Sequence, residues 1–242
     1  MRTLFRRLGG LALSFIATLA PAASPGVTDG AVSIGMSAPF TGPNGAYGVA
    51  MREAIAAYFA RLNKAGGING RKVELVSLDD GYEVERTVAN TRTLINEKKV
   101  FALVAYYGSS STTSAMEVFS AEKVPLVGTI SGADSLRMPP NRYMFNVRAS
   151  YANETEAIVR QLTSLGVNRI AVFYQNDGFG KSGLDGVTAS LKKSNLTPVA
   201  VASVERNSLE VAPAVQTIAK ANPQAIVMIT LFKPTAEFVR QL

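Results

Sequence analysis

The chain has 242 residues, none of them histidine or cysteine, and it carries a net charge of +7 at neutral pH. Without imidazole or thiol groups it cannot form a disulfide, a Ser-His catalytic pair or a cysteine nucleophile, and it lacks the commonest metal ligand. The positive charge is spread without a long basic run, which indicates solubility more than nucleic-acid binding.

Residues 1–22 have the layout of a secretory signal. Three arginines within the first seven residues precede an uncharged apolar run at 8–20, and small residues follow at 20–22. The run of thirteen residues is too short for a membrane-spanning helix, which needs about 20. We therefore predict cleavage after 1–22 and a periplasmic location. The remaining chain would carry +4, and without a cysteine it could not take a lipid anchor.

From residue 31 onward, short β-rich runs alternate with amphipathic helices. In the helix predicted at 46–64, for example, Ile55, Phe59 and Leu62 share one face, and Gly66-Gly67 ends it. The predicted strands are 31–37, 72–78, 100–106, 124–128, 143–148, 169–174, 198–204 and 224–230. The predicted helices are 46–64, 84–97, 110–122, 152–165, 180–194, 209–221 and one beginning near 234. Repeated β-α units of this size predict an α/β fold with parallel sheets and right-handed crossovers.

The stretch 131–142 interrupts this alternation with two prolines and several polar residues. We interpret it as the edge of a first lobe, with the crossover to a second lobe near 148–150. The predicted division is a first lobe at 23–148 and a second lobe at 149–242. Because the chain stops inside a helix that has just begun, we expect the second lobe to be incomplete and the sequence to be truncated.

Four loops follow predicted strands at their carboxyl ends, where open parallel α/β sheets bind ligands. They are 39–48 (PFTGPNGAYG), 106–113 (YYGSSSTT), 128–133 (GTISGA) and 175–182 (QNDGFGKS). The serines at 109–111 lie between a strand and a helix, where hydroxyl and free N–H groups can bind an anion. Serine is also favoured as an ordinary helix cap, so this run alone leaves both interpretations open.

Two further motifs have simpler interpretations. The sequence QNDGFGKSG is similar to a phosphate-binding P-loop, but Gln175 stands where that motif requires glycine, and a turn into a helix is favoured. Asp79-Asp80-Gly81 offers two carboxylates without further ligands, which favours a solvated turn over a metal site. We predict neither a metal nor another cofactor.

The motifs VSIGMSAPFTGPNGAYG, AGGINGRKVEL, YYGSSST and YQNDGFGKSGL occur in order across residues 31–242. Together they resemble the periplasmic branched-chain amino-acid-binding proteins of ABC importers. The resemblance implies the type I periplasmic-binding fold: two Rossmann-like lobes with parallel sheets, helices on both faces and hinge strands between them. Complete members are longer and return to the first lobe, which this chain does not reach.

The resemblance also implies a function. The protein would be a binding component and not an enzyme, its partners would be a small solute and the membrane permease subunits, and it would act as a monomer without nucleic acid. The solute, an amino acid or related carboxylate, would dock on the first lobe and be buried when the second lobe closes.

The solute's polar groups are assigned by the same resemblance. Ser109, with Ser110, would hold the α-carboxylate. Backbone groups at Ile130 and Gly132, with Ser131, would hold the carboxylate and the ammonium. The family's acidic partner for the ammonium would lie beyond the last residue.

Aromatic side chains would complete the site. Tyr47 matches an aromatic lid residue, whereas Phe179 and Phe232 stand where the family usually presents tyrosines and therefore lack the hydroxyl. Tyr106 and Tyr107 point to opposite faces if the strand continues through them, and we favour Tyr107 as the one in the cleft.

Other functions remain open. Phe179 and Phe232 are compatible with aromatic acids, amides or urea-like solutes. The same fold could serve as a sensing module for a signalling partner. A serine enzyme would need a lysine such as Lys181 as its base, because the chain has no histidine.

Overall fold

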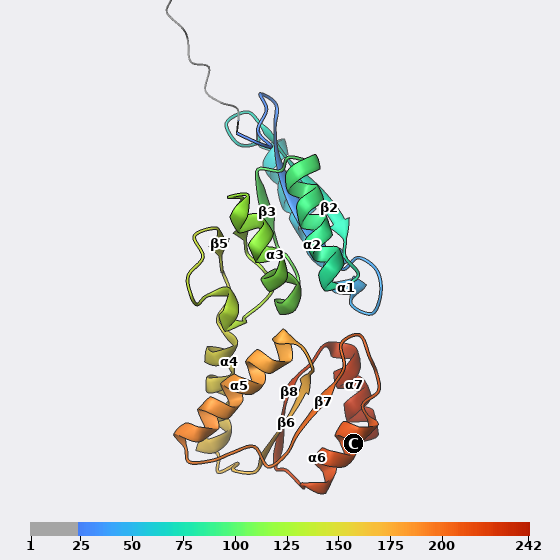
Figure 1. Cartoon of the computed structure of the whole chain (residues 1–242), viewed down its shortest axis with the longest axis vertical. Helices are drawn as coiled ribbons and strands as arrows, with labels where there is room; N and C mark the ends of the chain where they lie inside the picture. Colours follow the sequence, from blue (N-terminus) through green and yellow to red (C-terminus); the bar gives the residue numbers. More distant parts are fainter. Residues whose placement is uncertain (1–23) are drawn as a thin grey trace, which may run out of the picture.

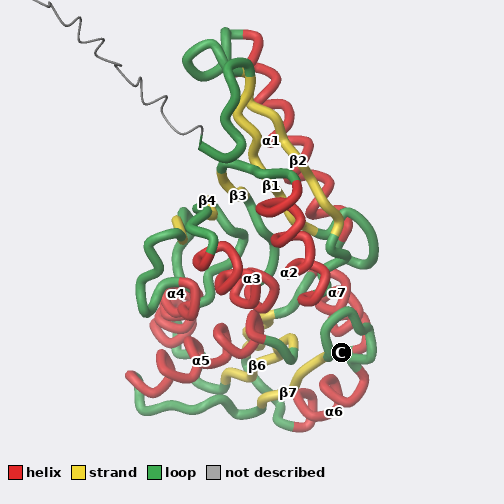
Figure 2. Tube along the Cα trace, turned by 45° about the horizontal axis from the view of Figure 1, so that its top comes forward, coloured by secondary structure: helices red, strands yellow, loops and turns green. Residues whose placement is uncertain are grey.

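Two parallel β-sheets organise residues 24–242, the part of the chain that the computed structural model describes. The predicted secretory segment at 1–22 lies outside the described residues. The first sheet lies in the upper part of the molecule and the second in the lower part, and both views show them well apart (Figures 1 and 2).

The first sheet has the strand order β2-β1-β3-β4-β5, with every neighbouring pair parallel. Its strands are β1 (Ala31–Ala38), β2 (Lys72–Asp79), β3 (Ala102–Val104), β4 (Leu126–Val127) and β5 (Met144–Phe145). Helix α1 (Gly45–Lys64) packs Met51 and Ile55 against one face. Helices α2 (Val84–Arg92) and α3 (Ser109–Ala121) belong to the other face, where Phe119 and Leu103 share a core.

The second sheet has the order β7-β6-β8 and is also parallel. Its strands are β6 (Ile170–Gln175), β7 (Val201–Val204) and β8 (Ala225–Ile229); its helices are α4 (Tyr151–Ser164), α5 (Gly178–Lys193), α6 (Ala212–Lys220) and α7 (Phe232–Gln241). In the central strand β6, Ile170 and Val172 pack on the α4 and α5 side, whereas Ala171 and Phe173 pack on the α6 and α7 side. This alternation explains why the strand reads as one continuous apolar run.

Each predicted strand and helix has a counterpart in the structure, with shifted ends. The predicted strand 100–106 is among those that are shorter in the structure, since β3 stops at Val104. Ala105 has a φ of 53°, a left-handed conformation that interrupts an extended strand. The predicted helix 84–97 is also divided, because its last turn, Thr93–Glu97, is a π-helix.

The irregular stretch at 131–142 contains a short 3-10 helix, Asp134–Leu136, and leads into the edge strand β5. Residues 146–150 then connect this strand to α4 in the lower part of the molecule (Figure 1). Among the helices of residues 24–242, none has both the length and the apolar character needed to cross a membrane.

The prediction of a solvated turn at Asp79 and Asp80 is wrong. The Asp80 side chain is fully buried and accepts hydrogen bonds from Ser37 Oγ at 2.8 Å and the Tyr82 amide at 2.9 Å. Burial raises the pKa of Asp80. Asp79 accepts from the Phe40 amide at 2.7 Å and from several neighbours, so the two carboxylates join the ends of β1 and β2.

Asp79 makes a testable contribution to stability. Burial raises its pKa, but hydrogen bonds from Thr41, Phe40, Gly81 and Arg86 outweigh burial and hold the pKa well below its ordinary value. We expect Asp79→Asn to lower the free energy of unfolding by about 2 kcal/mol at pH 7, because charge-assisted hydrogen bonds are lost from a side chain that is only a quarter exposed.

The pH dependence follows from the sign of this shift. The advantage of wild type over Asp79→Asn should be complete above the ordinary aspartate pKa of about 4 and should shrink as pH falls below it, because the unfolded state then binds the proton first. Urea denaturation of both proteins at pH 7 and pH 3 measures this. An equal difference at the two pH values would contradict the assignment.

Candidate functional site

A cavity of about 210 Å³ lies between the two sheets. Its walls come from loops and first helical turns that follow strands of both sheets, together with the connection into α4. The lining residues are Tyr47, Tyr82, Tyr107, Gly108, Ser109, Ile130, Arg148, Tyr151, Phe179, Thr230 and Leu231. The cavity thus lies at the carboxyl ends of parallel strands, the place where open α/β sheets bind ligands. Its size suits one small solute, since pockets for drug-sized ligands measure roughly 300–1,000 Å³.

Ser109 begins α3 and lines the cavity. Its hydroxyl lies 2.7 Å from the hydroxyl of Ser131, and the two share a hydrogen bond. The preceding Gly108 has a φ of 97°, and a Cβ there would lie 2.6 Å from the Tyr82 ring. Glycine therefore allows both the turn into the helix and the close approach of Tyr82. The N-terminus of α3, where partial positive charge and unpaired N–H groups gather, borders the cavity.

The three serines have different partners. Ser110 Oγ accepts from the Gly178 amide at 3.0 Å, and Ser111 Oγ accepts from Arg206 at 3.1 Å. Gly178 begins α5 and Arg206 lies in the loop after β7, so both contacts reach the part of the chain that contains the second sheet. None of these four residues belongs to the cavity lining formed by the described residues. The residue that caps α3 is Gly108, so the alternative of a serine cap is wrong.

In the loop after β4, Ile130 lines the cavity, whereas Ser131 and Gly132 contact residues that line it. Ile130 lines it, but its amide already donates to the Tyr106 carbonyl at 2.8 Å. Ser131 is fully buried and reaches the site through its hydrogen bond to Ser109. The Gly132 carbonyl accepts from the Tyr151 amide at 2.7 Å, and a Cβ on Gly132 would lie 2.5 Å from the Tyr151 ring.

Five aromatic side chains surround the cavity. Tyr47 stacks on Tyr107 with ring centres 5.5 Å apart, and Tyr82 meets Tyr107 edge-on at 5.4 Å. Tyr151 and Phe179 form a second pair at 5.4 Å. Burial raises the pKa of Tyr82 to about 12, so its hydroxyl is neutral at physiological pH. The walls are therefore largely apolar and carry few charges.

Two other aromatic residues considered for the site, Tyr106 and Phe232, do not line the cavity formed by the described residues. Tyr106 is fully buried and shares a hydrogen bond with Thr91, whereas Tyr107 faces the cavity, as the sequence favoured. Phe232 contacts Tyr47 edge-on at 5.4 Å, but it is 41% exposed and lies outside the cavity lining of the described residues.

Arg148 is the one charged residue that lines the cavity within residues 24–242. Its guanidinium pairs with Glu154 at 2.6 Å and lies 5.3 Å from the centre of the Tyr151 ring. Nε and Nη2 of Arg148 both donate to Glu154, so this carboxylate offsets much of the positive charge at the cavity wall.

Sequence reasoning missed six of the lining residues: Tyr82, Gly108, Arg148, Tyr151, Thr230 and Leu231. The rule that ligands bind at strand ends had already selected the loop 106–113, which contains Gly108, and it would have found three more of them. Tyr82 follows the strand predicted at 72–78, Thr230 ends the strand predicted at 224–230, and Leu231 comes directly after it. Arg148 begins the crossover predicted at 148–150 and Tyr151 directly follows it, a segment that the strand-end rule does not cover.

The alternatives that need a base or a metal gain no support from the geometry. Lys181 lines a separate hollow with Asp134, Ser135 and Asp185, apart from the cavity that Ser109 lines. In the part of the chain that the structure describes, no three acidic side chains gather closely enough to hold a metal ion.

Comparison with known proteins identifies one family and several relatives of this chain. Residues 31–242 match the sequence profile of the family described as "Periplasmic binding protein". An "Amino acid binding protein" of Pseudomonas aeruginosa is 25% identical over 214 residues, which cover 87% of this chain and 57% of that protein. "Leu/Ile/Val-binding protein homolog 3" of Brucella melitensis is 26% identical over 196 residues, which cover 79% of this chain and 53% of that protein.

Solved structures agree with the sequence relatives. A substrate-binding periplasmic protein from Ralstonia solanacearum superposes with a TM-score of 0.83 at 36% identity, covering 87% of this chain and 60% of that one. The chain thus spans a little over half the length of the proteins that it matches.

Proposed function

The chain belongs to the periplasmic binding protein family, with the type I periplasmic-binding fold that its sequence predicts, and from this premise we propose that it captures a small carboxylate solute between two lobes. The lobes would be 23–148 and 149–242. The observation that carries the proposal is the cavity between the two sheets, bordered by strand ends of both and by the N-terminus of α3.

In the proposed mechanism the carboxylate docks first on Ser109 and the adjoining helix N-terminus. Closure of the second lobe then adds Phe179 and Leu231 to the cavity wall. The closed state is favoured only by the contacts that the solute makes there. Three or four hydrogen bonds to charged groups, at about 1.5–3 kcal/mol each, can support micromolar affinity, which corresponds to about −8 kcal/mol after the costs of binding.

An amino acid is the first candidate solute, because curated relatives include amino-acid-binding and Leu/Ile/Val-binding proteins. A specific observation favours a second candidate, an aromatic carboxylate. Five aromatic rings surround the cavity, and among the described lining residues none is acidic. An ammonium group would find no carboxylate partner on these walls, whereas an aromatic acid needs none.

The proposal includes a place of action and a partner. A periplasmic location and delivery to the membrane subunits of an ABC importer, with the protein acting as a monomer, are supported by its family membership. Coupling to a signalling partner instead of an importer is the alternative.

A thermal-shift screen tests this function. A solute present at 100 times its dissociation constant should stabilise the protein by about 2.7 kcal/mol, because it binds only the native state. The panel contains leucine, isoleucine, valine, benzoate-type acids and small amides. A shift with the aliphatic amino acids supports the first candidate and a shift with aromatic acids alone the second, whereas no shift across the panel contradicts solute capture.

Ser109→Ala locates the binding site. We expect it to weaken binding of the active solute roughly tenfold or more, because one hydrogen bond to a charged group is lost. Ser164→Ala is the matched control, since Ser164 is exposed on α4 and bonds only to its own helix. Equal affinities for the two variants in calorimetry would remove Ser109 from the site.

A further inference from the structure

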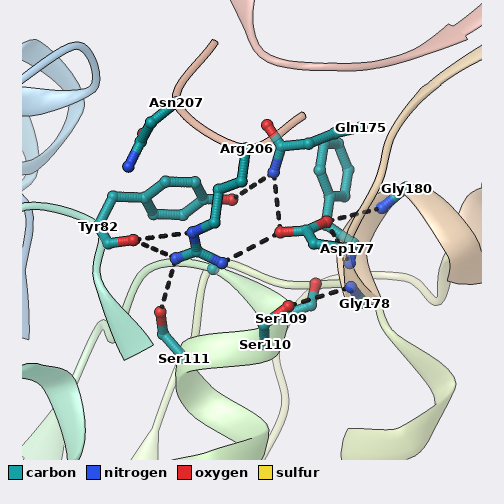
Figure 3. A network of polar contacts seen from close by, with 12 residues as sticks. Tyr82, Ser109, Ser110, Ser111, Gln175, Asp177, Gly178, Gly180, Arg206 and Asn207 are labelled. Carbon is teal, nitrogen blue, oxygen red and sulfur yellow. Dashed lines mark hydrogen bonds and ion pairs between the residues drawn. The ribbon is translucent and has the colours of Figure 1, made fainter. Parts of the chain in front are cut away.

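A network of polar contacts joins the two lobes beside the cavity (Figure 3). At its centre is Arg206, in the loop after β7 of the second lobe, with a side chain only 16% exposed. Its guanidinium donates to the main-chain oxygen of Tyr82 and to Ser111 Oγ, and both acceptors belong to the first lobe. A long, largely buried cation thus extends from one lobe into the other.

Arg206 also contacts the ring of Tyr82 in the first lobe and the carboxylate of Asp177 in the second. Its guanidinium carbon lies 3.7 Å from the centre of the Tyr82 ring, close enough for a cation–π interaction. Nη1 pairs at 3.1 Å with Asp177 of the second lobe, whose side chain is 9% exposed. Arginine suits this position because its planar group can stack on a ring and donate in several directions at once.

Neighbouring residues reinforce the same contact surface. Gln175 donates to both the Tyr82 hydroxyl, at 3.2 Å, and Asp177, at 2.8 Å. Asn207 donates to Glu83 at 2.7 Å. The Ser110 contact with the Gly178 amide and a bond from Asn44 to Asn207 at 3.2 Å add two further connections between the lobes.

We propose that Arg206 is a positioning residue that holds the lobes closed without touching the solute. Within the described chain it lies outside the cavity lining, yet its partners lead directly to that lining. Tyr82 is itself a cavity wall, and Asp177 accepts from the Phe179 amide at 2.9 Å and so fixes the start of the helix that carries Phe179. The inference rests on the proposed closure mechanism. It adds that the Arg206 contacts set the equilibrium between open and closed lobes.

This assignment has a distinctive consequence for binding. The apparent dissociation constant of a solute rises in proportion as the closed fraction falls. Loss of Arg206 should therefore weaken every solute by the same factor and leave the preference among solutes unchanged. A residue that touches the solute would change that preference.

Cross-linking measures closure without any solute. The sequence contains no cysteine, so an introduced pair reacts without background. A Cβ built on Gly178 would lie 3.8 Å from Ser110 Cα, which is within disulfide reach, and the double variant Ser110→Cys, Gly178→Cys reports contact between the lobes. We expect Arg206→Ala to slow disulfide formation in this background at least about tenfold, since a largely buried charged network is lost.

Two further variants make the result specific. Arg206→Lys keeps the charge but loses the planar double donation, so it should slow the reaction by an intermediate factor and serves if the alanine variant does not fold. Arg169→Ala is the matched control, because Arg169 bonds to the main chain at Ala221 and Asn222 within the second lobe. It should leave the rate unchanged.

The outcomes separate this inference from the proposed function. Equal rates with and without Arg206 in folded proteins overturn it, as does a double-cysteine protein that fails to cross-link with Arg206 present. A slowed reaction supports it even if no solute in the thermal-shift panel binds, in which case the proposed function alone fails. Where a solute does bind, a changed preference among solutes in Arg206→Ala also overturns the inference.

Discussion

Replacing Gly180 with alanine is expected to lower the free energy of unfolding by roughly 3 kcal/mol or more, at the upper end of the cost of overpacking. A Cβ at this position would lie 1.9 Å from the main-chain oxygen of Gln175 and 2.7 Å from its nitrogen. Both are backbone atoms of the central strand β6. Neither can move without displacing the strand or the first turn of α5, so the clash cannot be relieved by a side-chain rotation.

Gly30→Ala is the matched control for this prediction. In the described part of the chain, no atom comes within 4 Å of a Cβ built on Gly30. Chemical denaturation of both variants should therefore show a large loss for Gly180→Ala and a change within about 0.5 kcal/mol for Gly30→Ala. Similar stabilities would show that α5 can shift away from β6. The expected result also means that close packing against β6 accounts for Gly180, the second glycine of GFGK, so that no phosphate-binding role is needed to explain it.

Phe173→Ala is expected to cost about 3–5 kcal/mol, because it removes a large, fully buried side chain and leaves a cavity. Phe173 stacks on Phe238 of α7 with ring centres 4.2 Å apart, in a core that also contains Ile218 of α6. The substitution thus removes the aromatic contact of the middle strand with α7 and leaves Ala171 as the remaining buried apolar residue of β6 in this core.

Val239→Ala provides the comparison for Phe173→Ala. Val239 lies on α7 beside Phe238, but it is more than half exposed, so its truncation should change stability by no more than about 0.5 kcal/mol. Thermal and urea unfolding of the two variants measure the difference. A loss below about 1 kcal/mol for Phe173→Ala would mean that the helices close over the vacated space.

The order and type of the secondary structure could be predicted from the sequence because they depend on local patterns. The apolar run at 169–174 and the periodic face of 46–64 both identify elements that the structure contains. The end of β3 could not be predicted, because the left-handed conformation of Ala105 leaves no mark in residue type. The burial of Asp80 depends on Ser37, which is 43 residues away and reaches it only in the folded chain.

The site was predictable where strand ends and the family resemblance coincide. Tyr47, Tyr107, Ser109, Ile130 and Phe179 all line the cavity, although their binding roles remain predictions. The contacts between the parts of the chain that contain the two sheets were not predictable in the same way. Ser110 looks like part of a solute-binding run, but its partner is an amide 68 residues later in the chain. Only the relative placement of the two sheets makes that contact.

Tyr82 has a consequence for redesigning solute preference. Its amide donates to Asp80, its main-chain oxygen accepts from Arg206, and its hydroxyl accepts from Gln175, while its ring forms part of the cavity wall. Under the closure mechanism proposed above, a library that varies this position would select for folding and closure before it selects for a new solute. Tyr47 is 43% exposed and, among the interactions described, its side chain makes ring contacts only, which makes it the better first position to randomise.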